Sequence, residues 1–340
     1  MDLNPSKITL KHDLRALPYI FPFLAIFAVF IGYPLFYSVW ISLHRVTIYS
    51  DFYDLFGTMD FVGVDNYAQL VRDPVFWWSI FLTFVYSVLT IVPGMALSLA
   101  LALLLNRQIR GFGLLRSGFY LPNVFDLYVV GVIWLLIYNP GGGLFTSVLL
   151  WFSGFVDPVL LKTLGGARVG TVDMSGVLRG PVEIFARTGI LNNPYTTLPA
   201  IAFTMILKNA GFGMILFLTS LNSINQSIFE AADVDGASAR QKLFLITLPM
   251  LRPIILFLTI TGLMGTLNAF AEIYAMTDDT GGTSVNVAGV TLQSARISGY
   301  HLYKNFDQSM YGEAAAISFM LLLIALVISF LNYKVLSPRD

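Results

Sequence analysis

The chain has 340 residues, of which 56% are hydrophobic and 12% charged, and its mean hydropathy is +0.73. Ordinary soluble domains carry about 25% charged residues, so this composition indicates a membrane protein with several spans and excludes an ordinary soluble domain. The formal net charge is zero and cysteine is absent, which gives no reason to expect a nucleic-acid partner and excludes disulfides, thiol catalysis and cysteine-ligated metal.

Six largely uncharged stretches are long enough to cross a lipid bilayer, which takes about 20 residues in a helix. In chain order they are residues 16–43, 77–105, 117–139, 198–220, 253–276 and 314–333. Membrane helices tolerate the prolines and glycines within these stretches when neighbouring helices satisfy the freed backbone groups. We therefore predict an all-α integral membrane protein with six transmembrane helices.

Basic residues are concentrated on one side of these spans. They precede the first span and recur in the short loops that would share its side: Lys7, Lys11, Arg15, Arg107, Arg110, Arg116, Arg240, Lys242, Arg252, Lys334 and Arg339. Because cytoplasmic loops are enriched in Lys and Arg, we expect both termini in the cytoplasm and a first span that is a retained signal anchor. Segment 140–197 then lies outside the membrane, and loop 221–252 lies in the cytoplasm.

The cytoplasmic loop 221–252 combines small, acidic and turn-forming residues. Alanines beside Glu230 favour a short helix that can pack closely on another protein, and Gly236 can turn the chain without a Cβ penalty. Pro249 and Pro253 steer the chain back towards the membrane. The loop is predicted to be a compact helix-turn-helix. An ordinary amphipathic loop on the membrane surface is the alternative.

The spacing in this loop resembles the pattern E-A-A-x3-G-x9-I-x-L-P of binding-protein-dependent ABC importer permeases. The resemblance implies that the residues which couple the chain to an ATPase subunit are Glu230, Ala231, Ala232, Asp235, Gly236, Ala237, Ile246, Leu248 and Pro249. Further segments resemble the carbohydrate branch with the maltose-type permeases: Tyr33-Pro34-Leu35, Val62–Tyr67, Tyr120-Leu121-Pro122 and Ala314-Ala315-Ala316.

This resemblance covers nearly the whole chain and implies the type I ABC importer permease fold. The six-span permease domain would occupy residues 16–334, between a cytoplasmic segment 1–15 and a cytoplasmic tail 335–340. The expected function is ATP-driven import of a sugar, oligosaccharide or glycoside through the cell inner membrane. The implied partners are a second homologous permease subunit, two ATPase subunits and an extracytoplasmic solute-binding protein.

The chain itself is expected to be neither an ATPase nor any other enzyme. It lacks the G-x4-G-K-[ST] phosphate-binding loop, so ATP and Mg are expected on the partner ATPase subunits and no cofactor on this chain. The three histidines, His12, His44 and His301, lie far apart in the sequence and are expected to be surface residues rather than metal ligands.

Ionisable residues inside spans are costly and therefore functional candidates. Asp126 is expected to be a snorkelling or interhelical residue, whereas Lys208 is either a structural partner of Glu272 or a substrate contact. Sugar recognition needs donors and acceptors together with an apolar surface. The candidate substrate path comprises positions aligned with the maltose-type permease and their neighbours: Met205, Lys208, Asn209, Gly262, Thr266, Asn268, Ala269, Glu272 and Tyr274.

Three alternatives remain open from the residues. An importer of glycerol phosphate or another polyol-like solute would be expected to have more cationic residues on the path than Lys208. A self-sufficient secondary transporter or channel could relay ions through Lys208 and Glu272. An intramembrane enzyme lacks a convincing nucleophile and base. Segment 140–197 is either a solvated insertion or a contact for the solute-binding protein.

Overall fold

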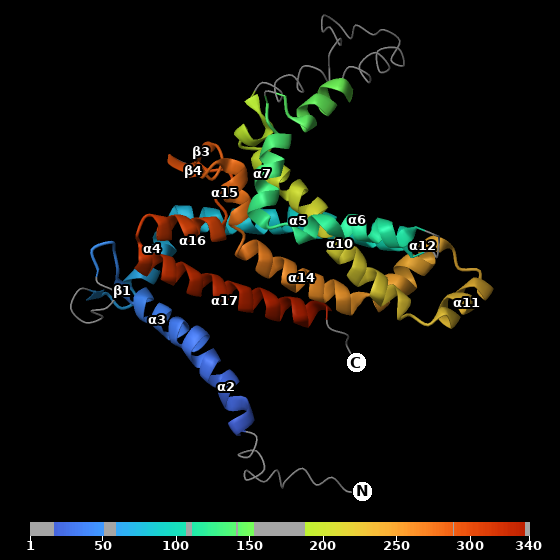
Figure 1. The fold of residues 1–340 in the computed structure, drawn as a ribbon, viewed down its shortest axis with the longest axis horizontal. Helices are drawn as coiled ribbons and strands as arrows, with labels where there is room; N and C mark the ends of the chain where they lie inside the picture. The colour runs from blue at the N-terminus through green and yellow to red at the C-terminus, as the bar shows by residue number, and fades with distance from the viewer. Residues whose placement is uncertain are drawn as a thin grey trace, which may run out of the picture. The chain divides into compact units, whose positions relative to one another are not determined.

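The computed structural model describes residues 17–50, 59–106, 111–140, 142–152, 188–287 and 289–336. Segment 1–15 and residues 153–187 of segment 140–197 lie outside the described residues. The chain separates into two compact units, of which the first is Met1–Arg72 with Lys304–Met320 and the second is Asp73–Tyr303 with Leu321–Asp340. Helices dominate the described residues of both units (Figure 1).

The first unit begins with a long apolar helix. Helix α2 (Leu17–Phe27) continues through a π-helical turn, Ala28–Gly32, into α3 (Tyr33–Ser42). Pro34 lies in the first turn of α3, where its missing N–H fits a local change of hydrogen-bond pattern. The stretch is long and apolar enough to cross a membrane, and its most apolar part is not buried within the chain.

Three short elements follow in this unit: β1 (His44–Arg45), β2 (Asp60–Phe61) and α4 (Asp65–Arg72). The two strands pair antiparallel. The buried Asn66 side chain donates hydrogen bonds to the carbonyl oxygens of Ser42 at 2.8 Å and His44 at 3.0 Å. Tyr311, at the start of α17 (Tyr311–Leu336), donates its backbone N–H to Val46. These bonds hold the end of the first span against the start of the last helix.

Helices α5 and α10 form the centre of the second unit. Its main elements are α5 (Pro74–Leu105), α6 (Phe112–Val124), α7 (Leu127–Ile137), the 3-10 turn Ile190–Asn192, α10 (Thr197–Asn222), α14 (Arg252–Leu267) and α15 (Ala271–Thr277). Helix α10 packs along α5 and against α6, α14 packs against α5, and α7 packs against α15. The side-chain Oδ atoms of Asp73 accept the N–H groups of Val75 and Phe76, which fixes the start of α5.

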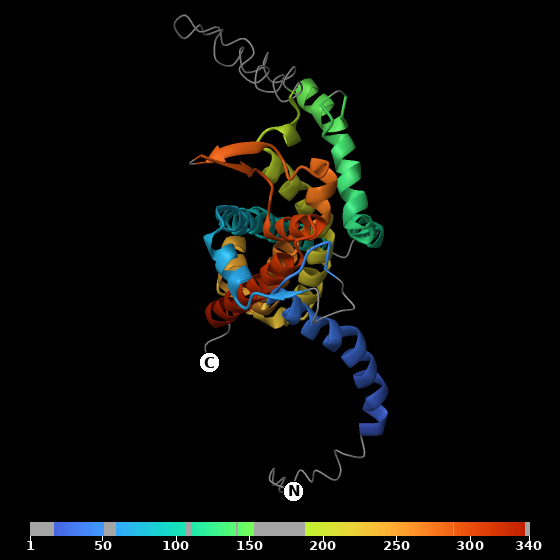
Figure 2. The same ribbon diagram turned by 90° about the vertical axis from the view of Figure 1, so that its left-hand side faces the viewer.

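The connection after α15 folds back onto α5. It contains β3 (Ser284–Val287), β4 (Val290–Gln293) and α16 (Ser298–Asp307). Figure 2 shows the β3–β4 hairpin, in orange, extending away from the helices of this unit. Trp78 of α5 donates to the carbonyl oxygen of Gln293 at 2.9 Å, and the backbone N–H of Ser298 donates to Thr83 at 2.8 Å. The hairpin and α16 are therefore fixed to the start of α5.

The prediction of one continuous helix over 117–139 is wrong. Helices α6 and α7 are bent by 98° at a break between Val124 and Leu127. Asp126 has an extended backbone and its Oδ1 accepts the N–H of Tyr128 at 2.9 Å, so this carboxylate begins a new helix. Asp126 is exposed at the break, and its snorkelling or interhelical role stays a prediction.

The predicted fifth span, 253–276, is also interrupted. Helix α14 ends at Leu267 and α15 begins at Ala271. The Asn268 side chain donates to the carbonyl oxygen of Met264 at 2.9 Å, and the backbone N–H of Asn268 donates to the same oxygen at 3.3 Å, so Asn268 caps the end of α14. Helix α16 also lies directly on the break, because a Cβ at Gly299 would overlap the backbone of Ala269.

Within the described residues, four helices are long and apolar enough to cross a membrane, or up to six segments if each bent pair is one span. The four are Tyr19–Ser42, Pro74–Leu105, Thr197–Asn222 and Tyr311–Leu331; the bent pairs are Gly113–Val124 with Leu127–Ile137, and Ala239–Met250 with Arg252–Leu267. This range includes the predicted six spans without fixing that number.

Two histidines expected at the surface are buried. His44 and His301 are each 3% exposed. His44 Nδ1 donates to the carbonyl oxygen of Trp40 at 2.7 Å, and His301 Nδ1 accepts from Nε of Arg296 at 3.0 Å. Each ring forms a hydrogen bond with a polar group of its own unit. Residue type and spacing in the sequence did not reveal that these histidines are buried.

We predict that Gly211→Ala destabilises the second unit. A Cβ at Gly211 of α10 would overlap the carbonyl oxygen of Phe119 in α6, and backbone atoms cannot move aside as a side chain can. The expected loss is about 1–3 kcal/mol, measured as a lower thermal unfolding temperature in detergent. Gly118→Ala is the control, because a Cβ there meets no heavy atom within 4 Å. Equal unfolding temperatures for both variants would contradict the prediction.

A second prediction concerns pH. Burial, and then the charge of Arg296, lower the pKa of His301 to about 3, below its ordinary value of 6.5. The folded state thus favours neutral His301, so its contribution to stability is complete above about pH 6.5 and is lost as the pH falls towards 3. The slope is at most about 1.4 kcal/mol per pH unit. Thermal unfolding of His301→Gln between pH 7 and 4 should show a weaker pH dependence than the wild type; parallel curves would count against this assignment.

Candidate functional site

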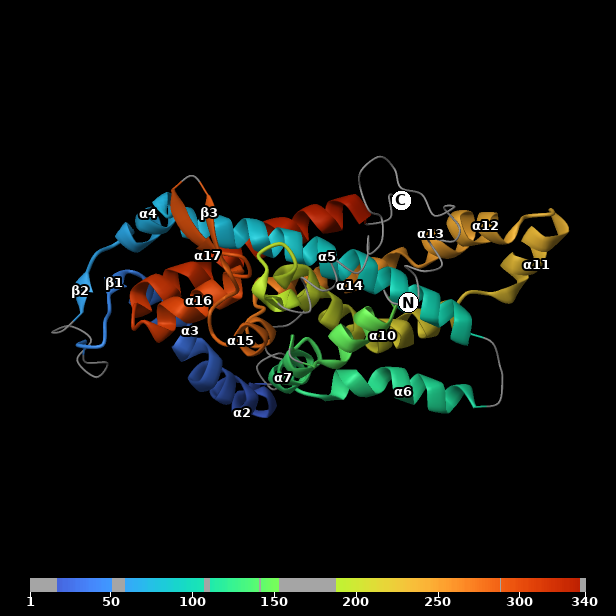
Figure 3. The same cartoon turned by 90° about the horizontal axis from the view of Figure 1, so that it is seen from above.

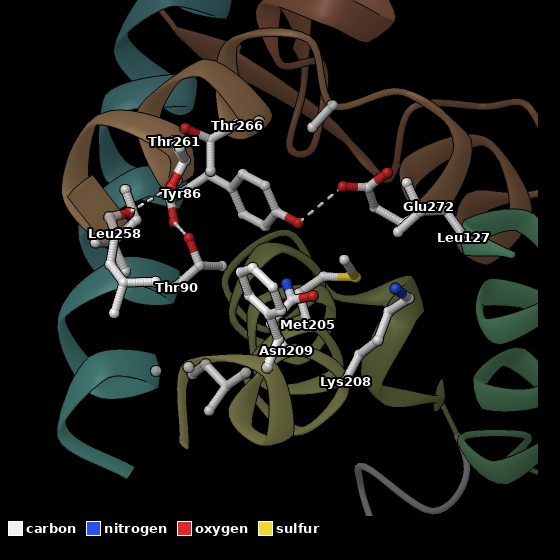
Figure 4. A pocket seen from close by; sticks show the side chains of 18 of the residues that line it. Tyr86, Thr90, Leu127, Met205, Lys208, Asn209, Leu258, Thr261, Thr266 and Glu272 are labelled. Carbon is white, nitrogen blue, oxygen red and sulfur yellow. Dashed lines mark hydrogen bonds between the residues drawn. The ribbon is translucent and has the colours of Figure 1, made fainter. Parts of the chain in front are cut away.

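A cavity of about 640 Å³ lies midway along α5 and α10. An apolar core on one side of it includes Leu82, Ile201 and Ile273, and a core on the other side includes Leu105, Phe217 and Leu251. The wall between these cores comes from the middle of α5, the middle of α10, α14 and the break between α14 and α15 (Figure 4). Interrupted backbone inside a membrane is tolerated where it lines such a cavity.

The cavity brings together all but one of the predicted path residues. Those on its wall are Met205, Lys208, Asn209, Gly262, Thr266, Asn268, Ala269 and Glu272. Tyr274 does not line it. Its ring packs on the rings of Phe270 and Tyr303, with centroids 5.5 Å and 5.6 Å away, and Phe270 itself lies on the wall. Tyr274 therefore supports an aromatic side chain of the wall.

Sequence reasoning missed the contribution of α5. Tyr86, Thr90 and Ser98 of this helix lie on the wall. The hydroxyl groups of Ser87 and Thr266 share a hydrogen bond of 2.6 Å, which ties α5 to α14 beside the cavity. The available signal was a stripe of polar and small residues at helical spacing inside an apolar span: Ser79, Thr83, Ser87, Thr90, Gly94 and Ser98.

Two opposite charges face this cavity. Glu272 is 4% exposed, and its Oε1 accepts a hydrogen bond from the hydroxyl of Tyr86 at 3.2 Å. Lys208 is 8% exposed and extends from α10 towards the side where Glu272 lies (Figure 4). In the described part of the chain no ion pair joins Lys208 to Glu272. The expectation of a direct structural pair is therefore not met, although the charges interact through space.

The remaining wall groups can hold a polar, uncharged ligand. Asn209 and Asn268 are exposed. The Nδ2 atom of Asn268 donates to the carbonyl oxygen of Met264, so its Oδ1 atom can accept a hydrogen bond from a ligand. Phe270 and Phe212 add aromatic surface. Amide donors and acceptors beside aromatic rings suit a ligand that has both hydroxyl groups and apolar faces. Within the described residues no group of His, Cys, Asp or Glu could hold a metal ion.

The polar loop 221–252 is a second candidate site. It lies between the end of α10 and the start of α14 (Figure 3). It contains α11 (Gln226–Val234), α12 (Ala239–Gln241), a π-helical turn (Lys242–Thr247) and α13 (Leu248–Met250). Gly236 has φ +75°, as the predicted turn requires. Ser238 and Gln241 form a capping box at the start of α12. The result is the compact helix-turn-helix predicted from the sequence.

The two arms of this loop are joined by a salt bridge of 2.5 Å between Lys242 and Asp233. The candidate coupling residues Glu230, Ala231, Asp235 and Gly236 are exposed, Ala237, Ile246, Leu248 and Pro249 are half-buried, and Ala232 is buried. Val234, at the tip, is 89% exposed, and Leu245 is 71% exposed. Leu251, which follows the loop, is buried in the adjacent apolar core. The loop therefore has a fixed base and an exposed tip with acidic and apolar side chains.

Several known proteins are similar to nearly the whole chain, although no protein-family model matches it. It is 29% identical over 338 residues to the lactose transport system permease protein LacF of Rhizobium radiobacter, covering 98% of each chain. It is 28% identical over 337 residues to the trehalose/maltose transport system permease protein MalF of Thermococcus litoralis, also covering 98% of each. The probable ABC transporter permease protein y4oQ of Sinorhizobium fredii is 30% identical over 308 residues, covering 91% of this chain and 85% of that protein.

Solved structures with a similar fold come from bacterial ABC transporters. A chain of an alginate transporter in complex with an alginate pentasaccharide-bound periplasmic protein matches with a TM-score of 0.67 and 21% identity, over 96% of this chain and 94% of that chain. A chain of a transporter involved in import of the acidic polysaccharide alginate matches with a TM-score of 0.66 and 21% identity, over 96% of each. These matches show the fold.

We predict that Tyr86→Phe destabilises the second unit. The change removes the hydroxyl that donates to Glu272 and leaves a buried carboxylate with one fewer donor. The expected loss is about 1–3 kcal/mol, measured by thermal unfolding in detergent. Tyr128→Phe is the control, because Tyr128 is an exposed tyrosine. In a double-mutant cycle with Glu272→Gln the losses should not add; additive losses would show that the bond contributes nothing.

Proposed function

Because this chain belongs to the ABC transporter permeases that include the lactose and trehalose/maltose permeases, we propose that it is the transmembrane subunit of an ATP-driven sugar importer. Its substrate would be a sugar, oligosaccharide or glycoside delivered by an extracytoplasmic solute-binding protein. The observation that carries this proposal is similarity to sugar permeases along 98% of the chain. The cavity supports it, because its amides, hydroxyls and aromatic rings suit a sugar.

We propose that the chain crosses the cell inner membrane six times, with both termini in the cytoplasm. The bent pair Gly113–Val124 with Leu127–Ile137 would then count as one span, and α14 with α15 as another. The permease domain would occupy 16–334, with a cytoplasmic segment 1–15 and a tail 335–340. Basic residues in the loops on one side support this orientation. It puts the β3–β4 hairpin and segment 140–197 outside and loop 221–252 inside.

The cavity would be the sugar path. Asn209, Asn268 and Thr266 would exchange hydrogen bonds with sugar hydroxyls, while Phe270 would pack on a ring face. Because the wall is formed by three helices and one interrupted span, small rigid-body shifts of these helices would open it to either side of the membrane. Such alternating access needs no chemistry on this chain.

Loop 221–252 would couple the cavity to ATP hydrolysis. Its exposed tip would seat in a cleft of an ATPase subunit, with Val234 as an apolar contact and Glu230 as a charged one. The Lys242–Asp233 salt bridge, which joins the two arms beside the tip, and Leu251, which is buried at the base, would pass a movement of the tip to the start of α14. ATP and Mg would bind to the two ATPase subunits, and a second permease subunit would complete the complex.

The test is co-purification with the ATPase, combined with uptake into proteoliposomes. Glu230→Lys reverses the exposed charge, and Gly236→Asp puts a side chain at φ +75°, where Asp costs about 1–2 kcal/mol. Both variants should lose at least about tenfold in sugar uptake, because an ABC importer whose ATPase does not engage cannot use ATP. Asp60→Asn, on the exposed β2 strand, is the control.

Retention of the ATPase and full uptake in both loop variants would overturn the coupling role. Sugar uptake by purified wild type without any ATPase or ATP would overturn the importer function itself. A self-sufficient secondary transporter would then take its place.

A further inference from the structure

The charges on the cavity wall sum to zero. Lys208 of α10 and Glu272 of α15 are the charged side chains among the described residues that line it; the rest of the wall is neutral. Asp126 also interacts with Lys208 through space, but it is exposed and lies off the wall. The cavity therefore presents one positive and one negative group to whatever enters it.

Within the residues that the structure describes, the carboxylate of Glu272 is held by a hydrogen bond, whereas the ammonium of Lys208 is not. Glu272 lies in the first turn of α15, where a carboxylate is favourable, and Tyr86 from α5 donates to its Oε1 at 3.2 Å. Among the described residues no hydrogen bond or ion pair engages the Lys208 ammonium, which extends into the same region (Figure 4). Tyr86 therefore fixes the anion from one side while the cation stays separated from it by part of the cavity.

A separated pair of charges in a membrane interior restricts what can enter. Because the wall has one basic and one acidic side chain, a neutral ligand leaves the charge balance unchanged. Its hydroxyl oxygens can accept from Lys208 and its hydroxyl hydrogens can be accepted by Glu272. An anionic ligand would pair with Lys208 and leave Glu272 uncompensated, which is costly away from water.

We propose that Lys208 and Glu272 form a charge-balanced filter that admits uncharged sugars and rejects sugars that carry a carboxylate or phosphate. Tyr86 is a positioning residue for Glu272 in this filter. The inference rests on the proposed function and narrows its substrate class to neutral glycosides. It also separates this chain from a glycerol-phosphate importer, whose substrate is anionic.

The experiment measures equilibrium binding of radiolabelled sugars to the purified full complex in nanodiscs, without the binding protein, so that delivery does not set the preference. The neutral probes are lactose and maltotriose, and the anionic probes are di- and trigalacturonate. Wild type should bind the better neutral probe at least tenfold more tightly than either galacturonate. Uptake of the same probes by proteoliposomes is recorded in parallel.

Single charge removals should change this preference in opposite ways. Glu272→Gln leaves the wall positive, so the ratio of neutral to anionic binding should fall at least tenfold. Lys208→Met leaves the wall negative, so galacturonate binding should weaken more than neutral binding. The exchanged pair Lys208→Glu with Glu272→Lys restores a net charge of zero and should regain the neutral preference. Asp307→Asn, which removes a carboxylate from α16 outside the cavity, should match the wild type.

Other results overturn the proposal. The filter is rejected if the wild type binds galacturonate more tightly than the neutral sugars, or if both single variants keep the wild-type ratio of neutral to anionic binding. Sugar uptake in the same preparation leaves the proposed function intact. If the wild-type complex holds no ATPase and neither binds nor takes up any probe, both the filter and the proposed function are rejected. Size-exclusion profiles identify a variant that does not assemble. If a single variant does not assemble, the exchanged pair is the test. An assembled exchanged pair that does not prefer neutral sugars rejects the filter.

Discussion

The close packing of α5 on α10 is the constraint on which the second unit depends. Small residues make it possible, because Gly213 leaves no room for a Cβ beside Ser98, and Ser98 donates to the carbonyl oxygen of Ala210 at 3.1 Å. Helices in lipid gain little from the hydrophobic effect between them, so close contact and hydrogen bonds hold them together. Since both apolar cores and the cavity between them lie along this one helix pair, any loss of its register would remove the cavity as well.

The break between α14 and α15 supplies polar groups to the wall of the cavity. A continuous helix would keep its polar backbone groups internal, whereas the break exposes Asn268 and brings Glu272 to the wall. Ser298 stabilises it, because its hydroxyl donates to the carbonyl oxygen of Leu267 at 2.9 Å and its N–H reaches Thr83. The orphan carbonyl at the end of α14 is thus satisfied by α16 rather than by water.

Much of this organisation was predictable from the sequence, because its signals are local. The apolar length of 77–105 corresponds to α5, and Gly236 marks the turn that the structure contains. The candidate path residues of α10 and α14 also meet at one cavity. The breaks at Asp126 and Asn268 were not predicted, since each lies inside an apolar run and is marked by a single polar side chain that bonds a backbone group at a helix end. The burial of His301 depends on Arg296 and α5, which only tertiary structure brings together.

Helix α16 contacts the cavity wall and directly follows the connection that carries β3 and β4. Its N-terminal residues lie against Ala269 without space for a Cβ at Gly299, and Ser298 is bonded to both α5 and α14. A ligand that shifts the break between α14 and α15 would therefore also shift the N-terminal residues of α16. Thermodynamic reciprocity then requires the converse. Binding in the cavity and binding on α16 would then be coupled, because both would shift the break between α14 and α15.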